Sequence, residues 1–519
     1  MAMIERELKL HVPDGAHTDI EKTLRAAGGR RVTLNARYYD TASRELAKAG
    51  IALRLRKEGR RWVQTLKAPG SDALSRLEFN HIRPEPSLDL WLYDGTPIQE
   101  VLRQLAQPLV LRYETRVSRL ILQQEMPDGL VEIAYDRGVI LAGRHELPID
   151  EVEFELVSGS PKAMFELGEQ WLQRYGLVLD LRSKAERGDR LASLAHDTPA
   201  PGKTARRLAD EVWPARRARE ITLKGKMSIA DAYQLCANEC LAQVVQNAAF
   251  AAGVDTARAG KSTHMEYIHQ LRVGIRRLRS CWRLFKPWMA PPDPADQEQL
   301  KAGFAIFGGS RDADITRLTV EPRIKADGLP EYRRPRRPHE AHADPAAAAA
   351  APGFQQALLH VLRDLVLMND AAQTAPAPTA EDAAAPTHDM PALRPAMVKR
   401  LNRWLKRIAK AGSGFTELAI EAQHDLRKEV KNLRYCVDFL ASLLSRSELA
   451  PLRTQLSSIQ DTLGNLNDDY IAEAYYLPLT DKQPQVWFAV GWLRAMQQHH
   501  RAQAQELFRQ LRKQGELRD

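Results

Sequence analysis

The chain has 519 residues, 44% of them hydrophobic, so we expect two or three domains with apolar cores. Residues 1–200 carry 29 basic and 30 acidic side chains, whereas the remaining residues carry 46 basic and 36 acidic ones. The C-terminal part should therefore attract an anion, such as nucleic acid, an acidic membrane surface or a phosphate-rich ligand. No run of about 18 apolar residues exists, and the first twenty residues are highly charged, so we expect neither a transmembrane helix nor a signal peptide.

Residues 1–160 are rich in β-strand signals. Two stretches with helical periodicity, 17–28 and 161–175, border or interrupt them. Six segments alternate apolar and polar side chains and are separated by Gly, Pro or Asp: 51–59, 60–70, 75–84, 113–122, 129–141 and 147–159. So many antiparallel strands in about 160 residues predict a barrel or a sandwich.

The rest of the chain has a helical pattern. Residues 197–220 are interpreted as a linker, which predicts a first domain over 1–196 and an all-α domain over 221–519. Two stretches, 319–352 and 371–396, have the low-complexity composition of mobile loops.

The four cysteines of the chain all fall in these helical segments, and they show no metal-site spacing. They are interpreted as reduced core thiols of a cytosolic protein: Cys236, Cys240, Cys281 and Cys436.

The helical part contains an internal repeat. The segment HQLRVGIRRLR at 269–279 recurs 155 residues later as HDLRKEVKNLR, and FGGSRDAD at 307–314 recurs 156 residues later as LGNLNDDY. Two matches at nearly one offset indicate two related helical bundles, over about 221–318 and 353–519.

Charged residues in the strand region recur with a period of two. Residues two apart share a face of a strand, so Glu5, Glu7 and Lys9 point the same way. The same spacing relates Arg54 to Arg56, Thr65 to Lys67, Arg76 to Glu78, and Glu151 to Glu153 and Glu155, and Glu132 and Asp136 share a face at twice this spacing. On one strand, a solvated surface is the simpler interpretation. Because the pattern recurs on six strands, with Val152 and Phe154 on the opposite face, it favours a charged barrel interior.

A charged interior of this composition points to phosphoryl chemistry. Packed carboxylates repel one another, and Mg²⁺ or Mn²⁺ would resolve that repulsion. Arginines and lysines on the facing strands would hold an anion, for which phosphate fits best. The combination describes a polyanionic substrate bridged by metal to the carboxylates.

The stretch Glu5-x-Glu7-x-Lys9 resembles the ExExK signature of the CYTH superfamily, the triphosphate tunnel metalloenzymes. The resemblance continues in order through YYDT at 38–41, LRLR at 53–56, TLK at 65–67, RLE at 76–78, Tyr113 to Arg119, EIAYDRG at 132–138, EVEFE at 151–155 and SKAERG at 183–188. It covers about 190 residues and implies an eight-stranded antiparallel tunnel.

The resemblance also implies roles for individual residues. The metal ligands would be Glu5, Glu7, Asp136, Glu151 and Glu153. The triphosphate would be bound by Arg54, Arg56, Lys67, Arg76, Arg119 and Lys184. The catalytic residues would be Lys9, Glu78 and Lys184. Lys9 would position or activate the attacking water. Glu78, Glu132 and Asp136 would hold a second metal or orient that water, with Tyr39 as a candidate partner of Lys9. Asn80 stands where family members often have an acid, which leaves the number of metal ions open.

Members of this family include inorganic, thiamine and RNA triphosphatases and class IV adenylate cyclases. No aromatic cluster stands out as a clamp for a base or a thiazole, and the parity of Trp62 places it outward. We therefore expect inorganic triphosphate, cleaved to pyrophosphate and phosphate, and an organic triphosphate remains the alternative substrate.

Two helical segments each place one histidine and three cations on one face. They are His269, Arg272, Arg276 and Arg279, then His424, Arg427, Lys431 and Arg434. A solvated face or a seam of salt bridges, with acids such as Asp312 and Asp468, is the simpler interpretation. The recurrence in register favours an anion-binding site, with metal ligation by the histidines as an alternative.

These segments and GSRDAD resemble CHAD domains, which commonly follow a CYTH domain. The resemblance covers about 220–519 and implies two pseudo-symmetric bundles that bind inorganic polyphosphate in a basic cleft. The second copy, LGNLNDD, lacks the arginine of GSRDAD.

The sequence thus predicts a multidomain α+β enzyme of the cytoplasm, with or without association with polyphosphate granules. Its alternative is a catalytically weak, polyphosphate-binding scaffold. Specific nucleic-acid binding is not expected, because RRPRRP at 333–338 lies in low-complexity sequence and the basic helices lack stacking aromatics. The oligomeric state stays open.

Overall fold

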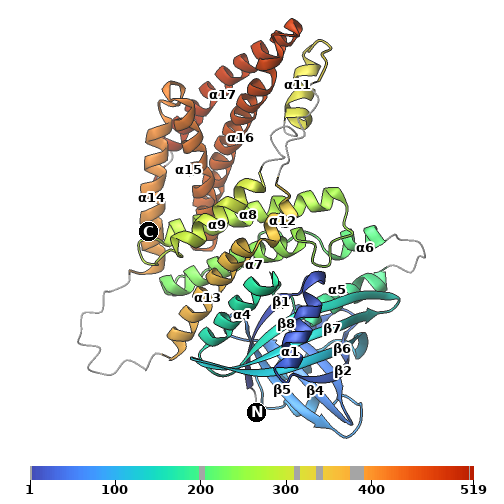
Figure 1. The fold of residues 1–519 in the computed structure, drawn as a ribbon. Coiled ribbons are helices and arrows are strands. Elements are labelled where there is room, and N and C mark those ends of the chain that lie inside the picture. The colour runs from blue at the N-terminus through green and yellow to red at the C-terminus, as the bar shows by residue number, and fades with distance from the viewer. Residues whose placement is uncertain are drawn as a thin grey trace.

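The computed structural model describes residues 3–197, 205–308, 316–334, 343–374, 391–513 and 515–518. Figure 1 shows a β-barrel, formed by the N-terminal part, beside a long helical part that continues to the C-terminus. The predicted α+β class, a barrel followed by helical bundles, is confirmed. None of the helices within these ranges is long and apolar enough to cross a membrane.

The barrel is an antiparallel sheet in the order β5-β4-β3-β2-β6-β7-β8-β1, closed by pairing of β1 with β5. Its strands are β1 (Met3–His11), β2 (Arg30–Thr41), β3 (Ala52–Glu58), β4 (Arg61–Pro69), β5 (Ser75–Arg83), β6 (Leu109–Met126), β7 (Gly129–Ala142) and β8 (His145–Gly159), with the short β9 (Val178–Leu179) added to β1. The six strand segments named above are confirmed. The alternation missed β2, whose first half is mostly exposed and carries few apolar side chains.

The outer faces of the strands form the apolar core. Leu8 and Phe154 are fully buried against α4 (Pro161–Tyr175), where Gly168 allows close approach to Leu8. Fully burying such a side chain stabilises the fold by roughly 1.5–3 kcal/mol. Shorter helices cover other parts of the barrel: α1 (His17–Ala26), α2 (Glu45–Lys48), α3 (Gln99–Arg103) and α5 (Lys184–Asp197). Because helices take the apolar faces, the charged faces turn inward.

The helical part consists of two groups of helices. The first contains α7 (Ile229–Ala251), α8 (Lys261–Phe285), α9 (Pro294–Ile306), α12 (Pro345–Ala350) and α13 (Pro352–Thr374). The second contains α14 (Leu393–Gly412), α15 (Ile420–Phe439), α16 (Arg446–Tyr476) and α17 (Trp487–Lys513). The four cysteines are free and buried in this part, as predicted.

The structure differs from the predicted division of the repeats. Residues 353–374 were assigned to the second repeat, but α13 packs against α7, α9 and α4, because Phe354 meets Phe307 edge-on and His360 contacts Asp296. The second group therefore begins at α14. The domain boundaries at 196 and 221 stay predictions.

Two stretches predicted to lack packed structure contain helices. Within 319–352, α11 (Glu321–Ala326) follows a π-helical turn, and Val320 and Ile324 are buried against Tyr476. Within 197–220, α6 (Ala205–Val212) forms and Trp213 is buried. A few apolar side chains suffice to anchor each segment, which composition alone does not reveal. The second predicted loop, 371–396, is shorter than expected because α13 reaches Thr374 and α14 starts at Leu393, and residues 375–390 lie outside the described ranges.

The barrel and the first helical group are packed together, with α4 and α13 side by side (Figure 1). Gln356 Nε2 donates to Glu169 Oε1 at 2.6 Å, and the His360 ring lies 3.1 Å from the same oxygen. The fully buried Gln355 accepts from Leu179 N at 2.9 Å and donates to Ala349 O at 2.6 Å.

We predict that Gln355→Leu destabilises the protein strongly. The change leaves two buried backbone groups without their partner, at about 1–3 kcal/mol each. Unfolding by denaturant, followed by the intrinsic tryptophan fluorescence of the protein, measures the effect. Gln356→Leu is the control, because its side chain is only part-buried, and equal midpoints for the two variants would contradict the prediction.

Candidate functional site

The barrel interior, called the tunnel below, holds charged side chains that are buried. The parity predicted for the strands is confirmed, since Glu5, Lys9, Glu78, Asp136, Glu151 and Glu153 are each at most 7% exposed. In the register, Lys9 pairs with Glu153, and Asp136 lies opposite Glu151 on one side and Arg119 on the other.

An acidic cluster forms where β7 meets β8. Carboxylate oxygens of Asp136, Glu151 and Glu153 lie within 4.8 Å of one another. Lys184, the first residue of α5, reaches in: its Nζ lies 2.6 Å from both Asp136 and Glu153 and also contacts Glu151. Arg119 donates to Asp136 at 2.6 and 2.7 Å and to Glu153 at 2.5 Å. Burial opposes ionisation of Glu153, but Lys184 and Arg119 hold its pKa well below the usual range.

A second cluster lies where β3, β4 and β5 meet β1. Lys67 Nζ is 2.5 Å from Glu5 and 3.6 Å from Glu78, and Arg54 is 3.9 Å from Glu78. Burial opposes both charges, yet Glu5 and Glu7 raise the pKa of Lys67, and Lys67 and Arg54 lower the pKa of Glu78. The cations and carboxylates therefore remain ionised together.

Glu7 lies between the two clusters. Burial is the main cause that raises the pKa of Glu7 to about 7, and the neighbouring Glu153 adds to it. Lys9 Nζ lies 3.7 Å from Glu7 and donates to the carbonyl of Arg182 at 2.9 Å. Hard carboxylate oxygens in excess of nearby cations are the donor set that Mg²⁺ and Mn²⁺ prefer, so these residues fit a divalent cation.

Three other predicted site residues, Arg56, Arg76 and Glu132, make their contacts outside the two clusters. Burial and the nearby Arg54 lower the pKa of Arg56 to about 10. Arg56 lines a cavity of about 500 Å³ with Glu58, Arg61, Val63, Asn80 and Ile82. Arg76 donates to the carbonyl of Ser75 at 2.8 Å, and Glu132 accepts from Gln123 at 3.3 Å.

The tyrosine beside Arg54 is Tyr38, and the suggested partnership of Tyr39 with Lys9 stays a prediction. Arg54 donates to the Tyr38 hydroxyl at 3.4 Å, and the Tyr38 ring stacks on Tyr113 at 4.6 Å. Tyr38 pairs with Arg54 in the regular register of β2 with β3, whereas the β-bulge between Tyr38 and Tyr39 lies in the pairing of β2 with β6.

Two arginines that the residue assignments missed also contact this site. Arg187 donates to Glu151 Oε2 at 3.2 Å, and the carbonyl of Arg182 holds Lys9. Arg187 belongs to SKAERG, the segment on which the resemblance rests, but its side chain received no role.

The basic helices α8 and α15 pack against each other in opposite directions. Ser280 bonds Asn432 at 3.1 Å and Cys436 at 3.6 Å, and further along Arg283 pairs with Glu429. The two basic stripes therefore run toward one another. Arg279 and Arg434 lie one and two residues from these contacts.

Side chains of the two stripes are positioned by aromatic and amide groups. Arg272 and Arg276 lie 4.5 and 5.7 Å from the Phe304 ring, and Arg427 donates to Asn467 at 3.2 Å. The other members of the stripes are half-buried or exposed: His269, Arg279, His424, Lys431 and Arg434. Asp468 follows Asn467 on α16, whereas Asp312 lies outside the described residues.

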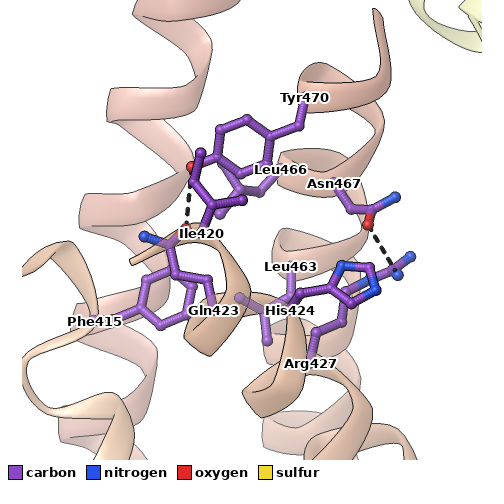
Figure 2. Close-up of a pocket in the computed structure, with 9 residues that line it drawn as sticks. All are labelled: Phe415, Ile420, Gln423, His424, Arg427, Leu463, Leu466, Asn467 and Tyr470. Atoms are coloured by element: carbon purple, nitrogen blue, oxygen red, sulfur yellow. Dashed lines mark hydrogen bonds between the residues drawn. The ribbon is translucent and has the colours of Figure 1, made fainter. Parts of the chain in front are cut away.

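Figure 2 shows a pocket between α15 and α16, in which His424 and Arg427 lie beside Asn467. Its volume is only about 20 Å³, and Phe415, Leu463 and Leu466 form much of its wall, so it cannot hold a phosphate chain. Burial and the neighbouring Lys428 and Arg427 lower the pKa of His424. Any anion bound here would lie along the surface of the helices.

Comparison with known proteins finds a family match for the barrel and another for the helical part. Residues 3–188 match the family model of the CYTH domain, and residues 237–476 match that of the CHAD domain. An inorganic triphosphatase of Haemophilus influenzae is 34% identical over 161 residues, which are 30% of this chain and 45% of that protein. The chain thus matches less than half the length of this relative.

Two solved structures are also similar. The CHAD domain of the plant Ricinus communis is 24% identical, with a TM-score of 0.41, over 59% of this chain and 98% of that one. A Hippeastrum protein, named as an adenylyl cyclase with a dominant triphosphatase activity, is 19% identical, with a TM-score of 0.28, over 38% of this chain and 98% of its own.

We predict that Gly188→Ala destabilises the barrel. An added Cβ would lie 2.2 Å from the Tyr113 ring, whose hydroxyl bonds the carbonyl of Ala185. Overpacking of this kind costs typically 1–3 kcal/mol. Thermal unfolding checks the effect against Gly15→Ala, where an added Cβ meets nothing within 4 Å. Equal stability of the two variants would show that α5 can move away at no cost.

Proposed function

We propose that this chain, which carries a CYTH domain followed by a CHAD domain, hydrolyses inorganic triphosphate to pyrophosphate and phosphate. CYTH tunnel enzymes depend on divalent metals, and the tunnel holds the acidic cluster that such a metal needs. The observation that carries the proposal is the juxtaposition of this cluster with the basic residues Arg54, Lys67 and Arg119 in one buried interior.

The ligands of the divalent ion, Mg²⁺ or Mn²⁺, would come from Asp136, Glu151 and Glu153, with Glu5 and Glu7 from β1. The ion would neutralise charge on the phosphates and orient them. Arg54, Lys67 and Arg119 would bind the phosphate oxygens, with Arg56 and Arg76 towards the ends of the substrate.

Two lysines would act closest to the reaction. Lys9 is buried between Glu7 and the carbonyl of Arg182, in a position to hold the attacking water. Lys184 already lies against three carboxylates and would share its charge with a phosphate oxygen once a metal binds there. Glu78, held by Lys67, is the candidate for holding a second metal or orienting the attacking water.

A small substrate is favoured over a nucleotide. The cavity beside Arg56 has no aromatic ring among its lining residues that could stack on a base. Trp62 lies outside it, with the cations of Arg37 and Lys57 about 6 Å from its ring.

We predict metal-dependent release of phosphate from inorganic triphosphate, and much slower release from ATP, thiamine triphosphate and long-chain polyphosphate. EDTA should abolish the release, because without a bound cation the carboxylates repel the polyanionic substrate. Binding without turnover of any of these compounds would instead support a scaffold function.

We predict that Glu153→Gln and Lys67→Ala each lower kcat/KM for triphosphate by about 10²-fold or more, since the first removes a proposed metal ligand and the second a cation placed at the phosphates. Glu146→Gln is the matched control, because Glu146 lies on the same strand as Glu153 but is exposed. If Glu153→Gln behaved like Glu146→Gln, the tunnel would not be the active site.

We propose further that the helical domain binds inorganic polyphosphate along the two stripes of α8 and α15. The support is their packing in opposite directions, which leads one stripe toward the other across the two helical groups. An extended polyanion gains from such an arrangement because each phosphate meets a further cation.

We predict that Arg279→Glu combined with Arg434→Glu weakens polyphosphate binding by at least about tenfold and flattens its dependence on salt, because fewer cations contact the polyanion. Titration by fluorescence anisotropy at several salt concentrations measures both effects. Arg512→Glu with Lys513→Glu makes the same change of charge at the exposed end of α17. An equal loss in this control would mean that only net charge matters.

A further inference from the structure

One acidic residue of the helical domain is buried against the tunnel domain. Asp255 lies in the loop between α7 and α8, and Arg187 donates to its two carboxylate oxygens at 2.8 and 3.0 Å. Arg182 is 3.0 Å from the same carboxylate. The side chains of all three residues are only 3–4% exposed. A buried carboxylate is therefore shared by two arginines of the other domain.

The loop holds Asp255 in an unfavourable backbone conformation. Its φ is 62°, in the left-handed region that side chains other than Gly, Asn and Asp rarely adopt. Thr256 anchors the loop through a bond from its hydroxyl to Phe250 O at 2.6 Å, and Val254 packs against Val178 of β9. Glycine would adopt this backbone conformation without placing a charge in the interior. The aspartate therefore contributes its carboxylate rather than its backbone conformation.

The two arginines lead from Asp255 to the tunnel. Arg187 also donates to Glu151 Oε2 at 3.2 Å, and Glu151 belongs to the acidic cluster. Arg182 presents its carbonyl to Lys9 Nζ at 2.9 Å. Asp255 is thus one residue removed from both Lys9 and Glu151, on two separate connections.

The charges explain what Asp255 does for this arrangement. Arg182 is further held by Asp180 at 2.7 and 2.9 Å and lies 4.7 Å from the rings of Trp213 and Phe250. Within the part of the chain that the structure describes, Glu151 is the other carboxylate partner of Arg187. Without Asp255, a buried guanidinium would depend on Glu151 alone for its counter-charge, and it would draw that carboxylate away from the cluster.

We propose that Asp255 is a positioning residue for the tunnel, which sets Glu151 through Arg187 and Lys9 through Arg182. The helical domain then completes the candidate active site in addition to any ligand that it binds. This inference rests on the proposed function, because it takes the acidic cluster as the metal site.

The test compares Asp255→Asn with Glu169→Gln in the full chain. Glu169 contacts His360 and Gln356 at the same junction between the domains but has no connection to the cluster, so it controls for a loosened interface. Binding of Mn²⁺ is measured by electron paramagnetic resonance without substrate, and kcat and KM for triphosphate are measured separately. Loss of a residue that orients a metal ligand typically costs 10–100-fold in metal affinity.

We expect Asp255→Asn to weaken Mn²⁺ binding by 10–100-fold and to lower kcat more than it raises KM, while Glu169→Gln leaves both within twofold of the wild type. Should Asp255→Asn not fold, Arg187→Lys serves in its place, because it keeps the charge but loses the fork that joins Asp255 to Glu151.

Three results would overturn the inference, and they are distinguishable. Mn²⁺ affinity unchanged in Asp255→Asn, with a wild type that binds the metal, refutes the positioning role alone. Equal losses in Asp255→Asn and Glu169→Gln assign the effect to a loosened interface. A wild type that binds no Mn²⁺ contradicts the proposed metal site itself.

Discussion

The compensation of charge inside the barrel is the constraint on which the rest of this structure depends. Helices take the apolar faces of the strands, so acids and bases must point into a narrow interior. An uncompensated buried charge costs far more than a hydrogen bond returns. Lys184 and Arg119 balance the cluster of β7 and β8, and Lys67 balances Glu5 and Glu78. The fold tolerates these groups only because they neutralise one another.

The same balance is compatible with the metal-bound triphosphate proposed for the interior. A cation that binds the carboxylates competes with Lys184 for the same oxygens, and a phosphate oxygen offers that ammonium a new partner. The metal ion would replace the ammonium at the carboxylates, and a phosphate oxygen would replace the carboxylates at the ammonium. Each exchange swaps one ion pair for another, so no charge would be left unpaired. Burial, with the neighbouring Glu153, raises the pKa of Glu7 to about 7, so the surroundings of this carboxyl oppose its charge.

Much of the tunnel could be predicted from the sequence because a period of two reports directly which side chains share a face. The inward set at Glu5, Lys9, Glu151 and Glu153 follows from that rule. The rule weakens where the chain is irregular, as at the bulge between Tyr38 and Tyr39 in the pairing of β2 with β6. It also carries no information on contacts between distant segments.

The packing of α13 against α4 is such a contact between distant segments, and the periodicity of α13 did not reveal it. Likewise, nothing near Asp255 in the sequence indicates two arginines from another domain. The internal repeat showed that the two halves are related but could not show how they have diverged. In the first half α9 ends at Ile306 and α13 covers α4, whereas in the second half α16 runs unbroken from Arg446 to Tyr476.

This divergence gives the two helical groups different physical roles. The first group is held to the barrel by α13 and by the loop of Asp255, whereas the second touches the first chiefly where α15 crosses α8. Only residues 256–260 separate Asp255 from the start of α8, the helix that carries the first basic stripe. Thr256 and Val254 fix this short loop through a backbone hydrogen bond and apolar packing. The carboxylate that holds Arg182 and Arg187 and the helix that carries the first basic stripe are therefore close neighbours along one continuous stretch of chain.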